Sequence, residues 1–170
     1  LCAGDGSLSP AHKALAEKTN PRRITGSLAD AMRSADVFVG VSAPGIVSRE
    51  MVASMAPGAV VFAMANPVPE IMPDEALSAG AAVVGTGRSD FANQINNVLA
   101  FPGIFRGALD VRASDINDEM KLAAVYALSG LVGNDELAAD YILPPAFDKR
   151  IAPTVARAVA KAARKSGAAR

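Results

Sequence analysis

The sequence predicts an α/β fold in which a doubly wound parallel sheet is followed by C-terminal helices. Three short and almost entirely apolar runs, 36–40, 59–65 and 81–84, alternate with helical stretches. Such runs are typical of strands that are buried on both faces of a parallel sheet. From Ser89 onward the apolar residues recur at helical spacing instead. We therefore place the sheet in about 1–90 and the helices in about 91–170, within one domain of 1–170.

The helices between the strands are predicted from the residues at their ends. Ser27 and Ser48 stand where an N-cap is expected, and Pro73 suits the first position of a helix. Gly80 follows the next helix as a C-terminal glycine. The helices expected before Ser89 are 11–18, 28–34, 49–55 and 73–80.

The second half of the chain contains longer helical patterns. We expect the first two helices to be separated by Phe101-Pro102-Gly103, because proline and glycine interrupt helices. The last helix is rich in alanine and ends in basic residues, which the helix dipole favours. The expected elements are helices at 93–101, 115–129 and 155–165, with an extended segment at 141–145.

Composition excludes several classes of protein. The 170 residues contain 17 Lys and Arg against 17 Asp and Glu, so the net charge is zero and nothing suggests nucleic acid or an anionic membrane. No apolar run reaches the roughly 18 residues that a membrane span needs. The single cysteine, Cys2, cannot form an internal disulfide, so we expect a reducing, cytoplasmic compartment. Because Leu1 reads like the end of a buried strand, we expect the chain to be cut from a larger protein.

Candidate ligand sites follow the three predicted strands. Ligands of open parallel sheets bind beyond the carboxyl ends of the strands, which here are 42–45, 66–70 and 85–90. Gly45 and Gly87 would allow a ligand to approach the backbone closely. Ordinary turns between strands and helices favour the same small and polar residues, so both interpretations stay open. Arg88 and Asp90 would form an ion pair or face a ligand.

Four amide side chains are clustered at 93–97, directly before an apolar run. Amides both donate and accept hydrogen bonds, so they suit a carboxylate, a hydroxyl or a carboxamide. The alternative is that they cap the helix that follows. No His or Cys cluster has the spacing of metal ligands, and no GxGxxG motif is present.

Several segments together resemble the malic enzyme family, and in particular its bacterial branch. The resemblance extends over almost the whole chain, and the segment that begins at Gly85 is the most specific. The segments are ADVFVGVSAPG (35–45), FAMANPVPEI (62–71), GTGRSDFANQINNVLAFPGIFRGALDVRA (85–113), INDEMKLAA (116–124) and YILPPAFDKR (141–150).

The resemblance implies an activity for the whole protein. Malic enzymes oxidise and decarboxylate malate to pyruvate with NAD or NADP, using Mg²⁺ or Mn²⁺ to polarise the carbonyl that forms. It also implies that the sheet is an incomplete Rossmann-like NAD(P)-binding domain. Its first strand, glycine-rich turn, catalytic Tyr and Lys and metal ligands would all lie upstream. No catalytic or metal-binding residue is then expected in this chain, which should be inactive alone.

The resemblance also assigns roles to individual residues and partners. The expected small-molecule partners are malate and pyruvate, with no nucleic acid or membrane, and the enzyme is expected to be a homo-oligomer. The loop after the strand expected at 36–40 should lie against the dinucleotide. Asn66 should lie near the nicotinamide and its ribose, and the amide cluster near malate. The cofactor-binding residues are then Val41, Ser42, Ala43, Gly45 and Asn66, and the substrate-binding residues are Asn66, Asn96 and Asn97.

One position departs from the family pattern. Malic enzymes often carry an acidic residue in Asp-x-x-Gly, where it binds the adenosine ribose. Matching Gly6 to that glycine puts Ala3 at the acidic position, with Asp5 displaced by two residues. The choice between NAD and NADP therefore stays open. Two other functions also remain: a non-catalytic dinucleotide-binding or regulatory module, and a different hydroxy- or amino-acid dehydrogenase.

Overall fold

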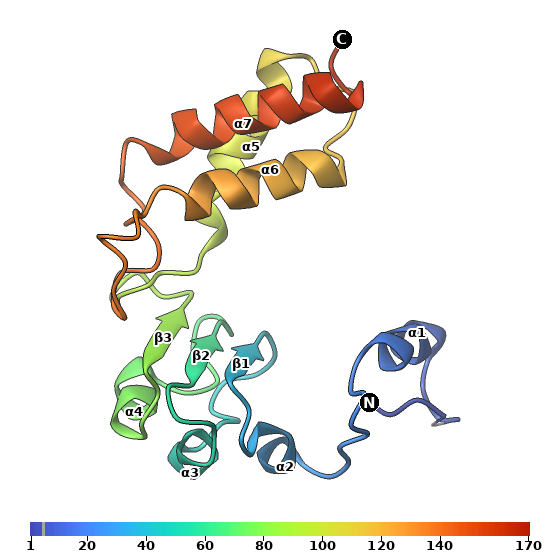
Figure 1. Ribbon diagram of the computed structural model, residues 1–170, viewed down its shortest axis with the longest axis vertical. Helices are drawn as coiled ribbons and strands as arrows, with labels where there is room; N and C mark the ends of the chain where they lie inside the picture. Colours follow the sequence, from blue (N-terminus) through green and yellow to red (C-terminus); the bar gives the residue numbers. More distant parts are fainter. Residues whose placement is uncertain (5) are drawn as a thin grey trace.

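A parallel three-stranded sheet forms the first half of the chain, as the sequence predicted. The computed structural model describes residues 1–4 and 6–170. Its strands are β1 (Val37–Gly40), β2 (Val60–Ala63) and β3 (Val83–Thr86), in the spatial order β1-β2-β3 (Figure 1). All neighbours are parallel, with Val37 paired to Val60 and Val60 paired to Val83. The carboxyl ends of the strands therefore lie along one edge of the sheet.

The helices of this half begin largely where the capping signals predicted. They are α1 (Pro10–Lys18), α2 (Leu28–Met32), α3 (Arg49–Ala53) and α4 (Pro73–Ser78). Ser27 accepts a hydrogen bond from the backbone N–H of Asp30, whose carboxylate accepts one in return from the N–H of Ser27. The hydroxyl of Ser48 caps α3 in the same way. These bonds satisfy N–H groups that a helix leaves unpaired at its start.

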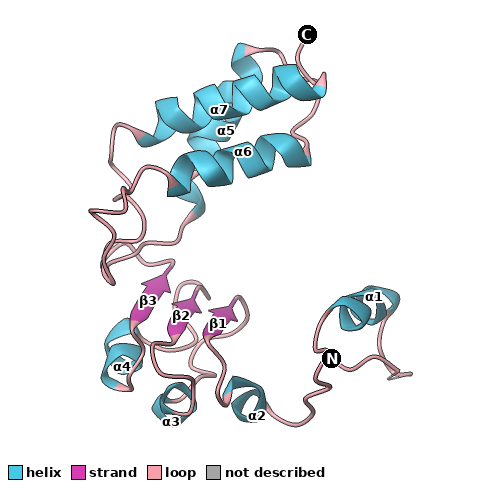
Figure 2. Ribbon diagram, viewed as in Figure 1, coloured by secondary structure: helices cyan, strands magenta, loops and turns pink. Residues whose placement is uncertain are grey.

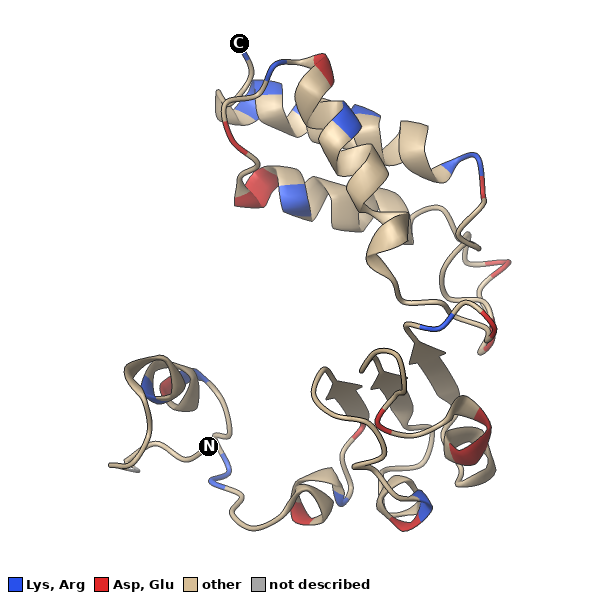
Figure 3. Ribbon diagram, turned by 180° about the vertical axis from the view of Figure 1, so that it is seen from behind, with Lys and Arg blue, Asp and Glu red and all other residues tan. Residues whose placement is uncertain are grey.

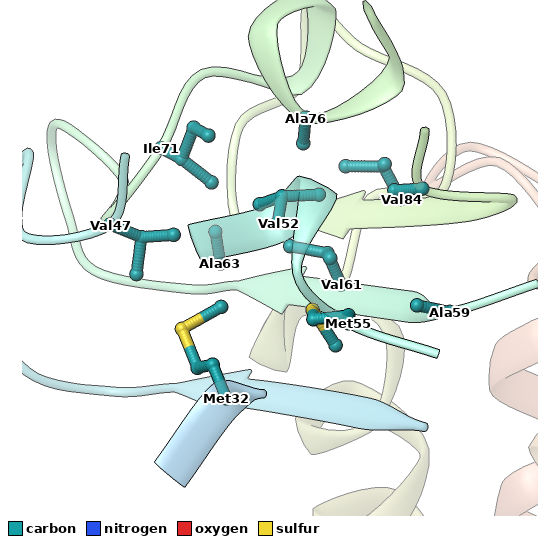
Figure 4. Close-up of a cluster of buried hydrophobic side chains, with 11 residues drawn as sticks. Met32, Val47, Val52, Met55, Ala59, Val61, Ala63, Ile71, Ala76 and Val84 are labelled. Atoms are coloured by element: carbon teal, nitrogen blue, oxygen red, sulfur yellow. The ribbon is translucent and has the colours of Figure 1, made fainter. Parts of the chain in front are cut away.

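Helices α2, α3 and α4 all lie against the same face of the sheet (Figure 2). Apolar side chains of these helices, of β2 and β3 and of the segments that connect them form the core that Figure 4 shows. On the opposite face Val37 and Val39 of β1 are 52% and 56% exposed. The expectation of helices on both faces is thus met on one face only. The core residues are Met32, Val47, Val52, Met55, Ala59, Val61, Ala63, Ile71, Ala76, Ala81 and Val84.

The second half of the chain folds around a core of its own. It contains the 3₁₀ turn η1 (Asn97–Leu99) and the helices α5 (Phe101–Asp110), α6 (Asp118–Ser129) and α7 (Ile151–Ser166), with α5 and α6 packed on α7 (Figure 1). A Cβ atom at Gly107 would lie 2.4 Å from the carbonyl oxygen of Ala156. One at Gly103 would lie 2.6 Å from Cβ of Val155. The two glycines thus allow α5 to approach α7 closely.

The expected helix at 93–101 is wrong. Residues 93–96 run beside the end of β3, and α5 begins at Phe101, so it includes the Pro102 and Gly103 that were expected to interrupt it. Proline fits the first turn of a helix, where its missing N–H would have no partner anyway. The same holds for Pro153, so that α7 begins at Ile151 rather than at Val155. The third strand lies two residues later than expected, at Val83–Thr86.

Charged residues of both signs are interspersed over the helices and loops and are absent from the three strands (Figure 3). The strand arrows point toward the helical half of the chain (Figure 1). None of the helices among residues 1–4 and 6–170 has the length and apolar character needed to cross a membrane.

Candidate functional site

The loop after β1 is tied to the segment that follows β2. The backbone N–H of Ser42 donates to Oε1 of Glu70 over 2.8 Å, and that of Ala65 donates to Oε2 over 3.0 Å. Gly45 and Val47 donate their N–H groups to the carbonyl oxygens of Pro69 and Glu70, at 3.1 and 3.0 Å. The two strand-end loops are therefore joined through the side chain of Glu70 and through the backbone of Pro69 and Glu70.

Glu70 is fully buried beneath these loops, with 0% of its surface exposed. Burial raises the pKa of its carboxyl group, but the backbone N–H groups of Ser42 and Ala65, with smaller contributions from Glu70 and Met64, lower it further. The pKa of Glu70 is consequently below that of an ordinary glutamate, and the side chain is ionised at neutral pH. A Cβ atom on Gly40 would come within 2.5 Å of this carboxyl group, so the glycine provides the space for it.

The residues predicted to bind the dinucleotide lie on the surface of these loops. Val41, Ser42, Ala43, Gly45 and Asn66 are all exposed. Gly45 has a φ of +67°, and a Cβ atom built there would meet nothing within 4 Å. The peptide bond between Asn66 and Pro67 is cis. The loops thus offer open backbone, as a ligand at the carboxyl edge of a parallel sheet requires.

The end of β3 is extended by a short pairing with the amide-rich segment. Thr86 forms an isolated parallel bridge with Gln94, and the N–H of Ile95 donates to the carbonyl of Thr86 over 2.8 Å. A Cβ atom on Gly87 would lie 3.8 Å from the carbonyl oxygens of both Ile95 and Met64. The amide-rich segment therefore lies beside the end of β3, and Gly87 lies between this segment and the end of β2.

Three asparagines of the amide cluster have three different environments. Asn93 is buried, and its amide donates to the carbonyls of Val84 and Ala139 while its oxygen accepts from the N–H of Ile142. Asn96 donates to the carbonyl of Gly87 over 3.1 Å and accepts from the N–H of Val98, which makes it the N-cap of η1. The capping interpretation thus describes Asn96, whereas Asn93 connects β3 to the 139–142 loop.

Asn97 is the exception in this cluster. Its side chain is exposed and has no hydrogen-bond partner among residues 1–4 and 6–170. It is the first residue of η1, directly after the capping Asn96. The backbone around Asn97 is therefore held in place while its own amide remains available to a ligand.

Other predicted candidates have ordinary structural partners or lie elsewhere. Arg88 and Asp90 form a two-pronged ion pair, with distances of 2.9 and 2.6 Å, and the guanidinium lies over the ring of Phe91. Ala3 and Lys13 line a hollow of about 270 Å³ near the start of the chain. Asp5 lies outside the described residues. No group of three or more His, Cys, Asp or Glu residues in the described part of the chain could hold a metal ion.

A parallel sheet with adjoining, open loops at its carboxyl edge is the architecture of Rossmann-like nucleotide-binding domains. The sequence model described as malic enzyme, NAD binding domain, matches residues 1–164. The chain belongs to the malic enzyme family.

Relatives and a solved structure agree with this match. The bifunctional malic/malolactic enzyme of Bacillus subtilis is 65% identical over 92% of the chain, and the NAD-dependent malic enzyme of Geobacillus stearothermophilus is 53% identical over 95%. The NADP-dependent malic enzyme of Rhizobium meliloti is 52% identical over 85% of the chain. The chain spans 38%, 34% and 21% of these three proteins.

The malic enzyme structure from Pyrococcus horikoshii superposes with a TM-score of 0.86 at 46% identity. The alignment covers 95% of this chain and 37% of that one.

Sequence reasoning overlooked Glu70, although it placed the residue in a strand-end loop. The available signal was a lone glutamate followed by the apolar Ile71, directly after Asn-Pro-Val-Pro. An ionisable residue in so apolar a setting is buried only when it is well paired.

Proposed function

We propose that the full-length protein oxidises malate with NAD or NADP and releases carbon dioxide, with pyruvate as product. The activity belongs to the whole protein, because this chain spans 38% of its relative in Bacillus subtilis. We assign to this chain the second half of the dinucleotide site and one amide of the substrate site. The observation that carries the proposal is the exposed amide of Asn97, which has no partner among the described residues and follows the segment paired with the end of β3.

The open loops of the sheet fit a dinucleotide. Ser42 and Gly45 expose backbone on which an extended ligand can lie, and no side chain among the described residues occupies the space beside Gly45. Asn66 extends this surface at the end of β2, where we assign it to the nicotinamide and its ribose. When bound there, NAD(P) supplies the group that accepts a hydride from the carbon bearing the malate hydroxyl.

The free amide of Asn97 suits malate. Its NH₂ group can donate to a carboxylate, and its oxygen can accept from the hydroxyl group. Asn96 supports this arrangement, since its bonds to Gly87 and Val98 fix the backbone from which Asn97 projects. The amide of Asn96 is occupied by these two backbone hydrogen bonds. We therefore assign Asn96 to the substrate site as the residue that holds Asn97 in position.

No metal ligand is assigned within this chain. The described residues include no cluster of acidic, histidine or cysteine side chains for a divalent cation. We accordingly propose that the metal and the proton-transferring groups come from other parts of the protein, and that the chain alone does not turn malate over.

The test is an assay of the purified full-length protein with malate, Mn²⁺ and either dinucleotide. We expect equal amounts of pyruvate and reduced dinucleotide, and no turnover after removal of the metal. Dinucleotide binding without malate-dependent reduction would contradict the proposal and favour a regulatory module. Lactate should be measured in the same assay, because the 65% identical relative is named a malic/malolactic enzyme.

The same assay addresses the choice of dinucleotide. Ala3 supplies no carboxylate to repel the 2′-phosphate of NADP. We therefore expect any preference for NAD in kcat/KM to stay below about a hundredfold, on the order of 3 kcal/mol. The similar identities to an NAD-dependent and an NADP-dependent relative, 53% and 52%, leave that choice to experiment.

A further inference from the structure

Glu70 is the one ionisable side chain among the buried residues of the described chain. A buried carboxylate is unfavourable unless hydrogen bonds replace the water that it loses. Here both oxygens are satisfied by backbone N–H groups, Oε1 by that of Ser42 and Oε2 by that of Ala65. The side chain therefore links two points of the backbone that are 23 residues apart in sequence.

The two donors have specific places in the candidate site. Ser42 belongs to the exposed loop after β1, and Ala65 directly precedes Asn66 at the end of β2. The backbone of the same glutamate also accepts the N–H of Val47, which fixes the far end of the first loop. Glu70 thus bonds to both loops, and the bond from the N–H of Gly45 to the carbonyl of Pro69 is a further contact between them.

Glu70 cannot serve as a direct ligand in this arrangement. It has no exposed surface, and both oxygens are directed at backbone donors. Nor does general stability explain a carboxylate here, because an apolar side chain of similar size fills a buried position at a lower desolvation cost. What an apolar side chain lacks is the ability to hold two N–H groups at fixed positions.

We propose that Glu70 is a positioning residue of the dinucleotide site, setting the loop 41–45 against Asn66 from beneath. This proposal rests on the proposed function for the identity of the ligand. Gly40 is part of the same device, because only a residue without a Cβ atom leaves room for the carboxyl group.

The experiment compares Glu70→Gln with Glu75→Gln in the full-length protein. Glutamine keeps the shape but has one accepting oxygen, so its NH₂ group must face one of the two N–H donors. Glu75 lies on the exposed side of α4, five residues away in the same segment, and serves as the matched control. The measurements are the dissociation constant of the reduced dinucleotide from its fluorescence, KM and kcat, and amide hydrogen exchange of peptides covering 41–47 and 64–67.

For Glu70→Gln we expect the dissociation constant and the KM of the dinucleotide to rise about tenfold or more. The value of kcat at saturation should change much less, and exchange should accelerate in both peptides. Glu75→Gln should match the wild type in every measurement. An unchanged dissociation constant, with or without a lower melting temperature, would overturn the positioning role and leave Glu70 as packing only.

A second variant covers the case in which Glu70→Gln does not fold. Gly40→Ala keeps the charge but pushes against the carboxyl group, and it should weaken the dinucleotide in the same direction. If neither variant folds, the role of Glu70 is structural and the proposal is wrong. Wild-type protein that binds no dinucleotide would instead refute the proposed function.

Discussion

The sheet half and the helical half of this chain differ in what they bury. The buried polar and charged residues of the described chain are Glu70, Thr86 and Asn93, and all three lie at or near the carboxyl ends of the strands. The interior of the helical half is formed by apolar side chains such as Met120, Val155 and Val159. Glu70 and Asn93 are satisfied by hydrogen bonds to the backbone, whereas the hydroxyl oxygen of Thr86 has no partner among the described residues. Side-chain hydrogen bonds therefore hold the carboxyl edge of the sheet, whereas the helical half depends on close packing.

The two halves are alike in leaving apolar side chains at the surface. Val37 and Val39 are exposed on β1, and Phe101, Phe105 and Leu109 form an exposed stripe at four-residue spacing along α5. Apolar patches promote association of isolated pieces of a protein. The stability and activity of the variants should therefore be measured in the full-length protein.

The largest effect is expected from Gly107→Val in the helical half. A Cβ atom at this position would already lie 2.4 Å from the carbonyl oxygen of Ala156 and 2.9 Å from Cβ of Val159. The two helices would have to separate, at a cost of about 3 kcal/mol or more. Thermal unfolding of the full-length protein should show a melting temperature lower by about 3 °C or more, since the shift per kcal/mol becomes smaller in a larger protein.

The control for this variant is Arg106→Ala on the same helix. Arg106 is exposed and makes an ion pair with Asp110, which contributes only about 0.3–0.5 kcal/mol. Equal melting temperatures for the two variants would show that close packing between α5 and α7 is not what stabilises the helical half.

The second prediction concerns Asn93, which connects the two halves. Asn93→Ala would remove three hydrogen bonds, to Val84, Ala139 and Ile142, and leave backbone groups unpaired. We expect a loss of about 2–3 kcal/mol in the free energy of unfolding. Asn134 is exposed and has no side-chain partner among the described residues, so Asn134→Ala is the matched control and should unfold like the wild type in urea. A similar stability for both variants would mean that the link is dispensable.

The amide cluster shows how far the sequence could lead. Its composition marked the region as unusual, but the spacing could not tell which asparagine is buried, which caps η1 and which is free. That distinction depends on the pairing of Gln94 with Thr86 and on the 139–142 loop, which is distant in sequence. Long-range contacts of this kind leave no periodic pattern in the sequence.

The strands and caps were predictable because their causes are local. Ser27 and Ser48 cap helices through residues three positions away, and the apolar runs show the strands directly. The start of α5 was predicted wrongly because Gly103 was interpreted as a helix breaker. A glycine is required there by the close contact with Val155, which lies on another helix. Glu70 was missed for the same reason, since its donor Ser42 is 28 residues away.

The third prediction tests the proposed role of Asn97, whose amide has no partner among the described residues. Asn97→Ala should lower kcat/KM for malate by roughly 10- to 150-fold, since losing a hydrogen bond to a polar substrate costs about 1.5–3 kcal/mol. The melting temperature and the dissociation constant of the dinucleotide should hardly change, because the side chain has no partner among the described residues. A variant that melts early but turns malate over normally would assign Asn97 to stability instead.

Asn66→Ala should weaken dinucleotide binding, malate turnover or both.

The smallest effect is expected from acid, and it separates the charge of Glu70 from its shape. The lowered pKa of the folded carboxyl group means that the ionised form stabilises the fold. This contribution is complete at neutral pH, above the ordinary glutamate value of about 4.3, and it is lost as the pH falls through the lower pKa of the folded state. Burial raises the pKa, and the backbone N–H groups lower it further than burial raises it, so the net downward shift does not depend on neighbouring charges. Glu70→Gln should therefore melt about 1 °C below the wild type at pH 7 in the full-length protein, on the order of 1 kcal/mol, and the difference should shrink in acid. Calorimetry of both proteins between neutral pH and the lowest pH at which they stay folded measures this difference. A gap that stays constant over that range would mean that the carboxylate stabilises the loops by its shape alone.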